Sequence, residues 1–207
     1  SHDIKTPLTS IINYVDLLKK EDVGNENARE YIQVLERQSA RLKKLIEDVV
    51  EASKASTGNI SFNPEPTDVV ELLNQAVGEY ENRFRENDLE PIVHTPPMPV
   101  KILADGRLLW RVFDNLLNNI CKYSQPRTRV YLDIRETDAN VIITMRNISK
   151  EILNVSPDEL IERFVRGDSS RSTEGSGLGL SIAQSLTELQ NGKFDLYLDG
   201  DLFKVSL

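Results

Sequence analysis

Two long stripes of largely apolar side chains run through the first 56 residues, and they restrict the possible folds more than any other feature of the sequence. Within each stripe, successive positions are separated alternately by four and three residues. This spacing places the side chains along one side of an α-helix, as in helices that pack over their whole length. The first stripe consists of Ile4, Leu8, Ile11, Val15 and Leu18, and the second of Tyr31, Leu35, Gln38, Leu42, Leu45, Val49 and Ala52.

The segment between the two stripes favours a turn, because residues 21–25 include Gly24 and Asn25. The sequence therefore predicts a hairpin of two helices. Such a hairpin has too little surface to bury both stripes alone, so we expect a second copy of the chain to complete a four-helix bundle. The alternative is a hairpin that packs on the rest of its own chain. The dimer is favoured because both stripes extend along nearly the full helices.

The pattern changes after the hairpin. Residues 56–59, Ser-Thr-Gly-Asn, favour an end to the second helix, and the segment 63–67 contains two prolines that make it resemble a stiff linker. We therefore predict a hairpin over residues 1–58, a linker over 59–67 and a second domain over 68–207.

The second domain mixes helical and strand-like periods. Alternating apolar and polar residues predict two paired strands over 130–136 and 141–146, and Asp105 can cap a helix that runs to about residue 123. Runs of helix and of antiparallel strand predict an α+β sandwich rather than a parallel doubly wound sheet. The other expected elements are helices over 68–85 and 178–190, strands over 92–94 and 101–104, and a closing hairpin of 193–198 and 202–207.

The charge and the apolar runs exclude several classes of partner. The net charge of -8 argues against nucleic acid, whose phosphates require clustered Lys and Arg. No run of about 18 apolar residues is present, so we expect no transmembrane helix in this stretch. The single cysteine, Cys121, favours a reducing compartment. Because the chain starts without Met and within a motif, we expect it to be a piece of a longer protein. Any membrane contact would then lie in a region absent from this chain.

A cluster of glycines directly precedes the predicted helix over 178–190. It reads Gly175-Ser176-Gly177-Leu178-Gly179. Glycine allows backbone N–H groups to approach an anion, and a helix N-terminus favours negative charge, so the cluster indicates a phosphate site. The alternative is a flexible loop before a helix. The polar segment 166–173 before it resembles a mobile lid in which Arg166 or Arg171 can reach a phosphate.

A second polar cluster interrupts the helix expected after Asp105. Asn115 and Asn119 are four residues apart and Lys122 follows three residues later, so all three share one helix face. Asn is a poor helix former, and the presence of a third asparagine, Asn118, indicates a purpose. Amide oxygens with a lysine can hold hydrated magnesium and the phosphates that it bridges. The alternative is a solvated polar face. Together with the glycine cluster, a nucleotide site becomes the better interpretation.

The first residues of the chain combine a nucleophile with a carboxylate. His2 stands beside Asp3, which can hold the imidazole tautomer or accept its proton, and Thr6 lies about one turn further along the helix. The alternative is a solvated surface histidine, which is the interpretation that we give to His94. Pro7 removes an N–H from the helix and predicts a local kink.

In their order along the chain, these stretches resemble the sensor histidine kinases of two-component signalling. Residues 1–9, Ser-His-Asp-Ile-Lys-Thr-Pro-Leu-Thr, are similar to the H box of the dimerisation and phosphoacceptor hairpin. Residues 115–124, 162–166 and 175–180 are similar to the N, F and G2 boxes of the ATP-binding fold shared with gyrase-type, Hsp90-type and MutL-type ATPases. The resemblance covers nearly the whole chain.

The resemblance implies a role for each matching residue. His2 would be the phosphoacceptor and Asp3 its general base, and Thr6 would orient the water that hydrolyses a partner's phospho-aspartate. The implied cofactors are ATP and Mg²⁺, and the implied partners are a second copy of the chain and the receiver domain of a response regulator. At the ATP site, Asn119 would bind magnesium with Asn115 beside it, Lys122 and Arg166 would contact phosphates, Tyr123 would contact the nucleoside, and Gly175, Ser176, Gly177, Leu178 and Gly179 would shape the lid and the helix start.

One box departs from the family pattern. Most members carry Asp-x-Gly-x-Gly after the second central strand, whereas residues 147–151 of this chain read Asn-Ile-Ser-Lys-Glu. The family aspartate accepts a hydrogen bond from the adenine amino group. Asn147 can also accept, through its side-chain carbonyl, but it carries no charge. We expect ATP binding to survive with weaker affinity or a different adenine contact. The alternative is that ATP binding is lost.

Three functions follow from the sequence. The first is an ATP-dependent histidine kinase that also acts as a phosphatase towards its response regulator. The second is a dimeric regulator or phosphatase that does not phosphorylate itself, because its adenine box has degenerated. The third is an ATPase of the gyrase or chaperone type, which the H box and the amphipathic hairpin disfavour.

Overall fold

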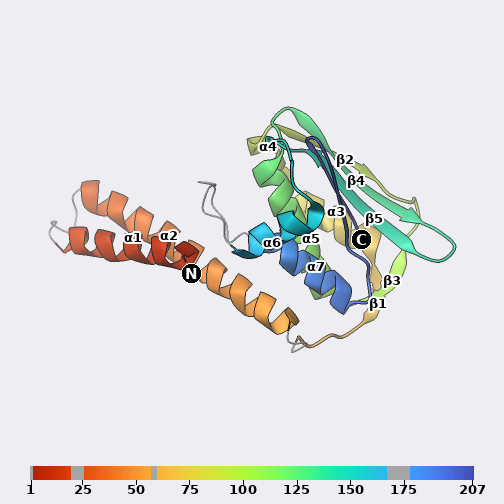
Figure 1. Ribbon diagram of the computed structural model, residues 1–207, viewed down its shortest axis with the longest axis horizontal. Coiled ribbons are helices and arrows are strands. Elements are labelled where there is room, and N and C mark those ends of the chain that lie inside the picture. The colour runs from red at the N-terminus through yellow and green to blue at the C-terminus, as the bar shows by residue number, and fades with distance from the viewer. Residues whose placement is uncertain (1, 20–25, 57–59, 167–177) are drawn as a thin grey trace.

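The computed structural model describes residues 2–19, 26–56, 60–166 and 178–207. A pair of long helices forms one part of the molecule and a layered α/β body forms the other (Figure 1). The helices are α1 (His2–Leu18) and α2 (Glu26–Ser56). Both helices of the predicted hairpin are therefore present, while its turn, residues 21–25, lies outside the described residues. Helix α1 continues through Pro7, and the kink stays a prediction.

The hairpin is held by contacts between α1 and α2. The rings of Tyr14 and Tyr31 are tilted against each other with centroids 5.5 Å apart, and Ala28 is buried. Both helices nevertheless leave large apolar side chains at least partly exposed, among them Leu8, Val15 and Val49 of the predicted stripes. Packing within one chain therefore leaves parts of both stripes uncovered.

A five-stranded mixed sheet forms the centre of the α/β body, and three helices cover one of its faces (Figure 1). The spatial order of the strands is β2-β4-β5-β7-β6; β2 and β4 are parallel and the other neighbours are antiparallel. This confirms the predicted α+β sandwich. The strands are β2 (Leu89–His94), β4 (Thr128–Glu136), β5 (Val141–Ile148), β6 (Asp195–Asp199) and β7 (Leu202–Ser206), and the helices are α3 (Val69–Glu79), α5 (Gly106–Tyr123) and α7 (Gly179–Leu189).

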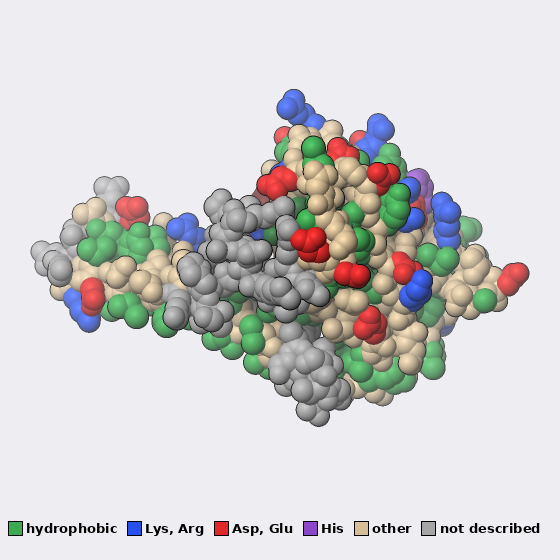
Figure 2. All heavy atoms as spheres, in the orientation of Figure 1, with side chains coloured by type: hydrophobic (Ala, Val, Ile, Leu, Met, Phe, Trp, Pro, Cys, Tyr) green, Lys and Arg blue, Asp and Glu red, His purple; other side chains and the backbone are tan. Residues whose placement is uncertain are grey.

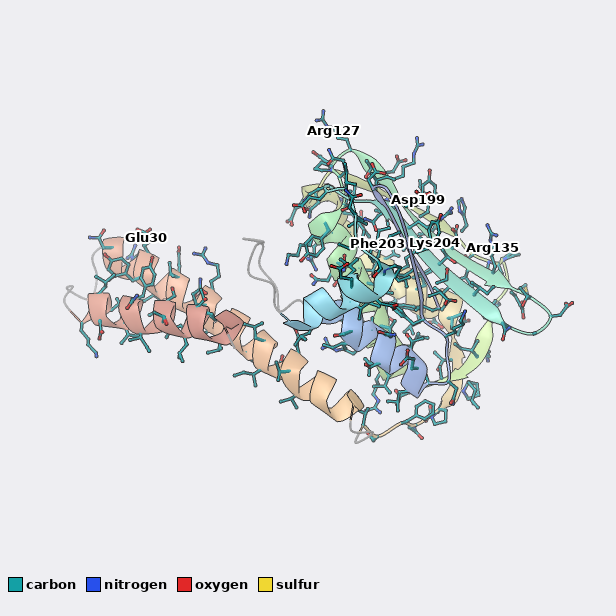
Figure 3. The ribbon with its side chains drawn as sticks, viewed as in Figure 1. Glu30, Arg127, Arg135, Asp199, Phe203 and Lys204 are labelled. Atoms are coloured by element: carbon teal, nitrogen blue, oxygen red, sulfur yellow. The ribbon has the colours of Figure 1, made fainter. Side chains whose placement is uncertain are left out.

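The two faces of the sheet differ in chemistry because successive side chains of a strand point to opposite sides. On β7, Phe203 is buried on the helix-covered face and Lys204 points to the other face (Figure 3). The second face holds Asp133, which is buried although the helices lie opposite. Its carboxylate accepts a hydrogen bond from Arg146 at 2.6 Å and lies 2.8 Å from Nδ1 of His94. His94 is exposed, as expected, but it is not isolated.

Four parts of the body differ from the sequence prediction. The helix predicted over 68–85 ends at Glu79, and a short helix α4 (Glu81–Glu86) follows, because the backbone of Tyr80, at φ -91° and ψ 0°, departs from regular helical geometry. The predicted linker ends in a strand, β1 (Glu65–Asp68), which pairs with β3 (Lys101–Ala104) in a separate two-stranded sheet. Helix α6 (Pro157–Arg166) and the parallel pairing of β2 with β4 were not predicted.

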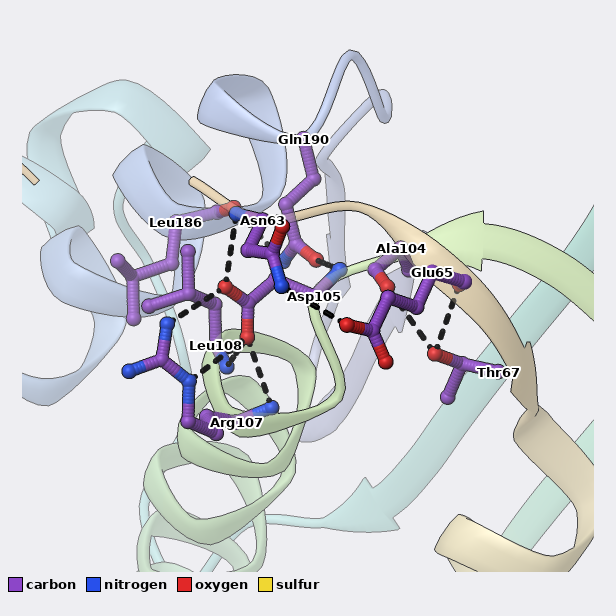
Figure 4. A network of polar contacts seen from close by, with 9 residues as sticks. All are labelled: Asn63, Glu65, Thr67, Ala104, Asp105, Arg107, Leu108, Leu186 and Gln190. Atoms are coloured by element: carbon purple, nitrogen blue, oxygen red, sulfur yellow. Dashed lines mark hydrogen bonds and ion pairs between the residues drawn. The ribbon is translucent and has the colours of Figure 1, made fainter. Parts of the chain in front are cut away.

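Asp105, whose carboxylate is buried, joins the start of α5 to two other segments (Figure 4). As predicted, it is the N-cap of α5 and accepts from the backbone N–H groups of Arg107 and Leu108. It also accepts from the backbone N–H of Asn63 at 3.1 Å and from the Arg107 guanidinium at 2.8 Å. Its own backbone N–H donates to Oε1 of Gln190, just beyond α7, at 3.0 Å. The linker, α5 and α7 therefore meet at one residue.

The helical hairpin and the α/β body contact each other along α2. Beyond α1, helix α2 runs beside α7 (Figure 1). Asp48 of α2 is only 4% exposed, and one of its carboxylate oxygens lies 3.7 Å from a guanidinium nitrogen of Arg111 on α5. Arg111 also lies 3.4 Å from Asp114. A buried acid and a partly buried base thus meet across the contact between hairpin and body.

Replacing Asp105 with Ala should lower the free energy of unfolding by about 2–4 kcal/mol, because the cap is lost and the Asn63 amide loses its acceptor. Denaturant unfolding at neutral pH measures the change. Arg107→Ala is the matched control and should have a much smaller effect, since its side chain is 71% exposed. Equal losses for both variants would contradict the central role of the carboxylate.

The same carboxylate predicts a dependence of stability on pH. Burial opposes its ionisation, but the hydrogen bonds from Arg107, Asn63 and Leu108 outweigh burial and hold the pKa of Asp105 below its ordinary value of 3.8. Its ionised form therefore stabilises the fold above that value, and this contribution is lost as the pH falls through the folded-state pKa. Stability should thus fall more steeply below about pH 4 in the wild type than in Asp105→Asn. If the free energy of unfolding fell equally with pH in the wild type and in Asp105→Asn, this prediction would be wrong.

Reversing the charge of Asp48 should separate the body from α2. Asp48→Arg places a second cation beside Arg111, and disrupting a buried pair costs about 3–5 kcal/mol. Small-angle X-ray scattering should show a larger radius of gyration than in the wild type. Glu47→Arg is the control, because Glu47 is exposed and should leave the radius unchanged. An unchanged radius in Asp48→Arg would mean that the ion pair does not hold the contact.

Candidate functional site

Helix α5 supplies the framework of the candidate site. Its apolar face, which includes Phe113, Leu116 and Leu117, is buried in the core and fixes the helix against the sheet. Asn115 is 8% exposed, and its Nδ2 donates to the backbone oxygen of Arg111 at 2.8 Å. That bond fixes the direction of the Asn115 side chain.

The asparagine and glycine motifs meet in space. Gly179 is the first residue of α7, and a Cβ atom added to it would lie 3.1 Å from Oδ1 of Asn115. The absence of a side chain therefore allows α7 to start directly beside the asparagine. This brings together two motifs that lie more than 60 residues apart in the sequence.

The remaining predicted residues of α5 lie one and two turns further along the helix. Asn119 is half-buried, and its side chain makes no hydrogen bond with the described part of the chain. The ammonium group of Lys122 lies 4.8 Å from the centre of the Tyr123 ring, a cation–π contact. Lys150 donates to the backbone oxygen of Lys122 at 3.1 Å.

The third asparagine of the cluster lies elsewhere. Oδ1 of Asn118 accepts a hydrogen bond from Arg83 of α4 at 2.8 Å. Nearby, the Tyr80 hydroxyl donates to Oδ1 of Asp114 at 2.6 Å, and burial together with that carboxylate raises the pKa of Tyr80. Asn118 therefore anchors α5 to α4, which explains its presence without a ligand.

Two buried polar atoms lack partners beyond the C-terminal end of α5. Asn147 on β5 is 4% exposed and its Oδ1 has no hydrogen-bond partner in the described structure, and the same is true of Oγ of the fully buried Ser124. The segments that carry them are joined, because Gln125 N–H donates to Ile148 O and Lys150 N–H donates to Tyr123 O, both at 2.8 Å. An unsatisfied buried polar atom costs about 1–3 kcal/mol. A ligand with hydrogen-bond donors would remove this cost.

Several predicted site residues fall outside what the structure describes. His2 and Asp3 begin α1 and Arg166 ends α6, but their side chains are not described. Thr6 lies on α1 and is exposed. Gly175, Ser176 and Gly177 lie outside the described residues, whereas Leu178 stands at the N-terminal boundary of α7.

Sequence reasoning did not single out Ser124 as a site residue. The signal that could have found it is its place directly after the helix, where its side chain can face the same space as that of Asn147. Within the described residues, no group of three or more His, Cys, Asp or Glu side chains could hold a metal. None of the helices described is both long and apolar enough to cross a membrane.

Comparison with known families defines the class of protein. Residues 1–58 match the His Kinase A (phospho-acceptor) domain, and residues 104–205 match the histidine kinase-, DNA gyrase B- and HSP90-like ATPase family. The chain belongs to the sensor histidine kinases, whose catalytic core combines these two domains.

Among curated relatives, the chain is 34% identical over 197 residues to the sensor protein VanSC of Enterococcus gallinarum, covering 93% of this chain and 54% of that protein. It is 27% identical to the histidine-protein kinase BaeS of Escherichia coli K12, covering 93% of this chain and 41% of that one. The chain thus spans about half of these relatives or less.

Solved structures share the fold. Histidine kinase AdeS of Acinetobacter baumannii superposes with a TM-score of 0.80 at 18% identity, covering 100% of this chain and 95% of that one. Histidine kinase ThkA, in complex with the response regulator protein TrrA, gives a TM-score of 0.73 at 19% identity, and the superposition covers 100% of this chain and 58% of that one.

A pair of glycine variants tests the contact between α5 and α7. Gly179→Ala should lower the free energy of unfolding by about 1–3 kcal/mol, because the new methyl group would crowd Asn115. Gly78→Ala, on α3 with nothing within 4 Å of the new Cβ, should instead stabilise by about 0.5–1 kcal/mol. Thermal or denaturant unfolding measures both. Equal stabilisation by the two variants would rule out the close approach.

Proposed function

We propose that this chain autophosphorylates on His2 at the expense of ATP and passes the phosphoryl group to an aspartate of a response regulator. The observation that carries the proposal is the presence, on one chain, of two family matches: a phosphoacceptor match over residues 1–58, which includes the His2-Asp3 pair, and an ATPase match over residues 104–205. We take the hairpin as residues 1–58, the linker as 59–67 and the ATP-binding domain as 68–207. Phosphatase activity towards the regulator, through Thr6, completes the proposal.

The residues of the candidate site suit a purine nucleotide. The unsatisfied Oδ1 of Asn147 is an acceptor for the amino group of adenine, and Tyr123 would contact the nucleoside. Asn119 would bind Mg²⁺ through its amide oxygen with Asn115 beside it. Lys122 and Arg166 would contact phosphates, and Gly175, Ser176, Gly177, Leu178 and Gly179 would form the lid and the start of α7, where N–H groups favour an anion.

The reaction requires positioning more than covalent work by the protein. Bound ATP supplies the γ-phosphoryl group, and magnesium neutralises phosphate charge. A ring nitrogen of His2 would form the new P–N bond as the bond to the leaving ADP breaks, and Asp3 would accept the proton from the other ring nitrogen. For dephosphorylation, the Thr6 hydroxyl would orient a water towards the regulator's phospho-aspartate.

A homodimer through the hairpin is part of the proposal. Apolar side chains gather on the visible face of the hairpin (Figure 2). Among the side chains that the structure describes on the two helices, eight large apolar ones are exposed, and a second copy would bury them. They are Leu8, Ile12, Val15, Leu17, Ile32, Ile46, Val49 and Val50. We further propose that the chain is the cytoplasmic part of a membrane sensor, as its curated relatives are named sensor proteins.

The second candidate function is a dimeric regulator or phosphatase that does not phosphorylate itself. One specific observation favours it: the segment 147–151 reads Asn-Ile-Ser-Lys-Glu and lacks the acid and both glycines of the family's adenine box. The unsatisfied buried Oδ1 of Asn147 weighs against complete loss of adenine recognition, because the acceptor that adenine needs is still present.

Incubation with γ-labelled ATP and Mg²⁺ distinguishes the two candidates. The wild-type chain should acquire an acid-labile, base-stable label, and His2→Gln should acquire none. Asn119→Ala should reduce labelling at least about tenfold if its amide holds the magnesium that orients the phosphates. An unlabelled wild-type protein that still binds ATP would eliminate the kinase and favour the regulator.

A further inference from the structure

The side chain of Asn147 has an environment that leaves its orientation open. It points from β5 into the helix-covered side of the sheet, where its neighbour on β7 is the buried Phe203. Its Oδ1 is buried without a partner, and the described residues give its amide no hydrogen bond that would fix one orientation. The amide can therefore rotate to exchange its oxygen and its nitrogen.

An amide and a carboxylate make different demands on a nucleobase. An ionised carboxylate only accepts hydrogen bonds, so beside position 6 of a purine it attracts an amino group and repels a carbonyl oxygen. An amide has one acceptor and two donor hydrogens. Towards adenine, Oδ1 accepts from the 6-amino group while Nδ2 donates to N1. Towards guanine, the rotated amide donates to the 6-oxo group while Oδ1 accepts from N1–H.

The hydroxyl group of Ser124, the second buried polar group without a partner in the described structure, can also reverse its hydrogen-bonding direction. Ser124 is fully buried, and it forms a backbone bridge with Ser149, two residues beyond Asn147. A hydroxyl group can donate or accept, depending on its rotation. Both polar groups without partners at this place are therefore uncharged and able to reverse their hydrogen-bonding direction.

We infer that Asn147 makes the nucleobase pocket accept 6-oxo purine nucleotides, such as GTP, as well as ATP. This inference rests on the proposed function, and it widens the class of phosphoryl donor for the same site. Replacing Asn147 with aspartate, the residue that most of the family carries, should remove the ability to bind both kinds of base, since a carboxylate has no donor for the 6-oxo group.

Equilibrium displacement of a fluorescent ATP analogue from the whole chain tests the inference. In the wild type, GTP and inosine triphosphate, which has the 6-oxo group but lacks the 2-amino group, should compete within about tenfold of ATP. In Asn147→Asp, both should weaken relative to ATP by about 5- to 150-fold, the discrimination expected of a two-bond amide contact with a base. Labelling from γ-labelled GTP, lost in His2→Gln, is a second readout.

A matched control distinguishes an effect specific to position 147 from a general effect of the added negative charge. Asn118→Asp makes the same chemical change on α5, but that side chain contacts Arg83 away from Asn147, so the ratio of GTP to ATP affinity should not move. ATP binding without GTP or inosine triphosphate binding in the wild type would overturn this inference and leave the proposed function standing. Failure of every nucleotide to bind would overturn both. These wild-type measurements decide the matter even if Asn147→Asp fails to fold.

Discussion

The carboxylate of Asp105 is the interaction on which the geometry of the body depends. It caps the start of α5 and accepts a hydrogen bond from the backbone N–H of Asn63, in the segment arriving from the hairpin. The backbone N–H of the same residue donates to the side chain of Gln190, just beyond α7. Because α5 carries Asn115 and α7 begins at Gly179, the relative position of these two residues follows from where Asp105 holds the two helices. One buried acid thus aligns two motifs that are distant in sequence.

Local patterns were sufficient to predict much of this architecture. The four-three spacing predicted two helices, Asp105 was recognised as a cap, and alternation predicted β4 and β5, because each signal depends on residues within one or two turns. The convergence of Asn115 and Gly179 followed from the family resemblance rather than from spacing alone. The role of His2 as phosphoacceptor, with Asp3 as its base, stays a prediction, because their side chains lie outside the described structure.

The features that escaped prediction depend on distant partners. Nothing around Leu89 indicates that β2 will pair in parallel with β4, and nothing around Asn118 indicates that Arg83 will bind it rather than a ligand. Asp48 lies among exposed residues of α2, 46–47 and 49–50, and its burial depends on the approach of the α/β body, where it meets Arg111 of α5. The local sequence would continue a helix through Tyr80, whereas α3 ends there and the Tyr80 hydroxyl donates to Asp114 on α5.

The fastening of α5 along its length has a consequence for binding entropy. The helix is held at its start by Asp105, near its middle by Tyr80 and Arg83, and at its end by the backbone bonds to Ile148 and Lys150. Asn115 and Asn119, which we propose to face the nucleotide, therefore occupy a rigid support before any ligand arrives. Immobilising flexible groups opposes association. For α5 that immobilisation is completed during folding, so the affinity of a ligand is not reduced by the ordering of this helix.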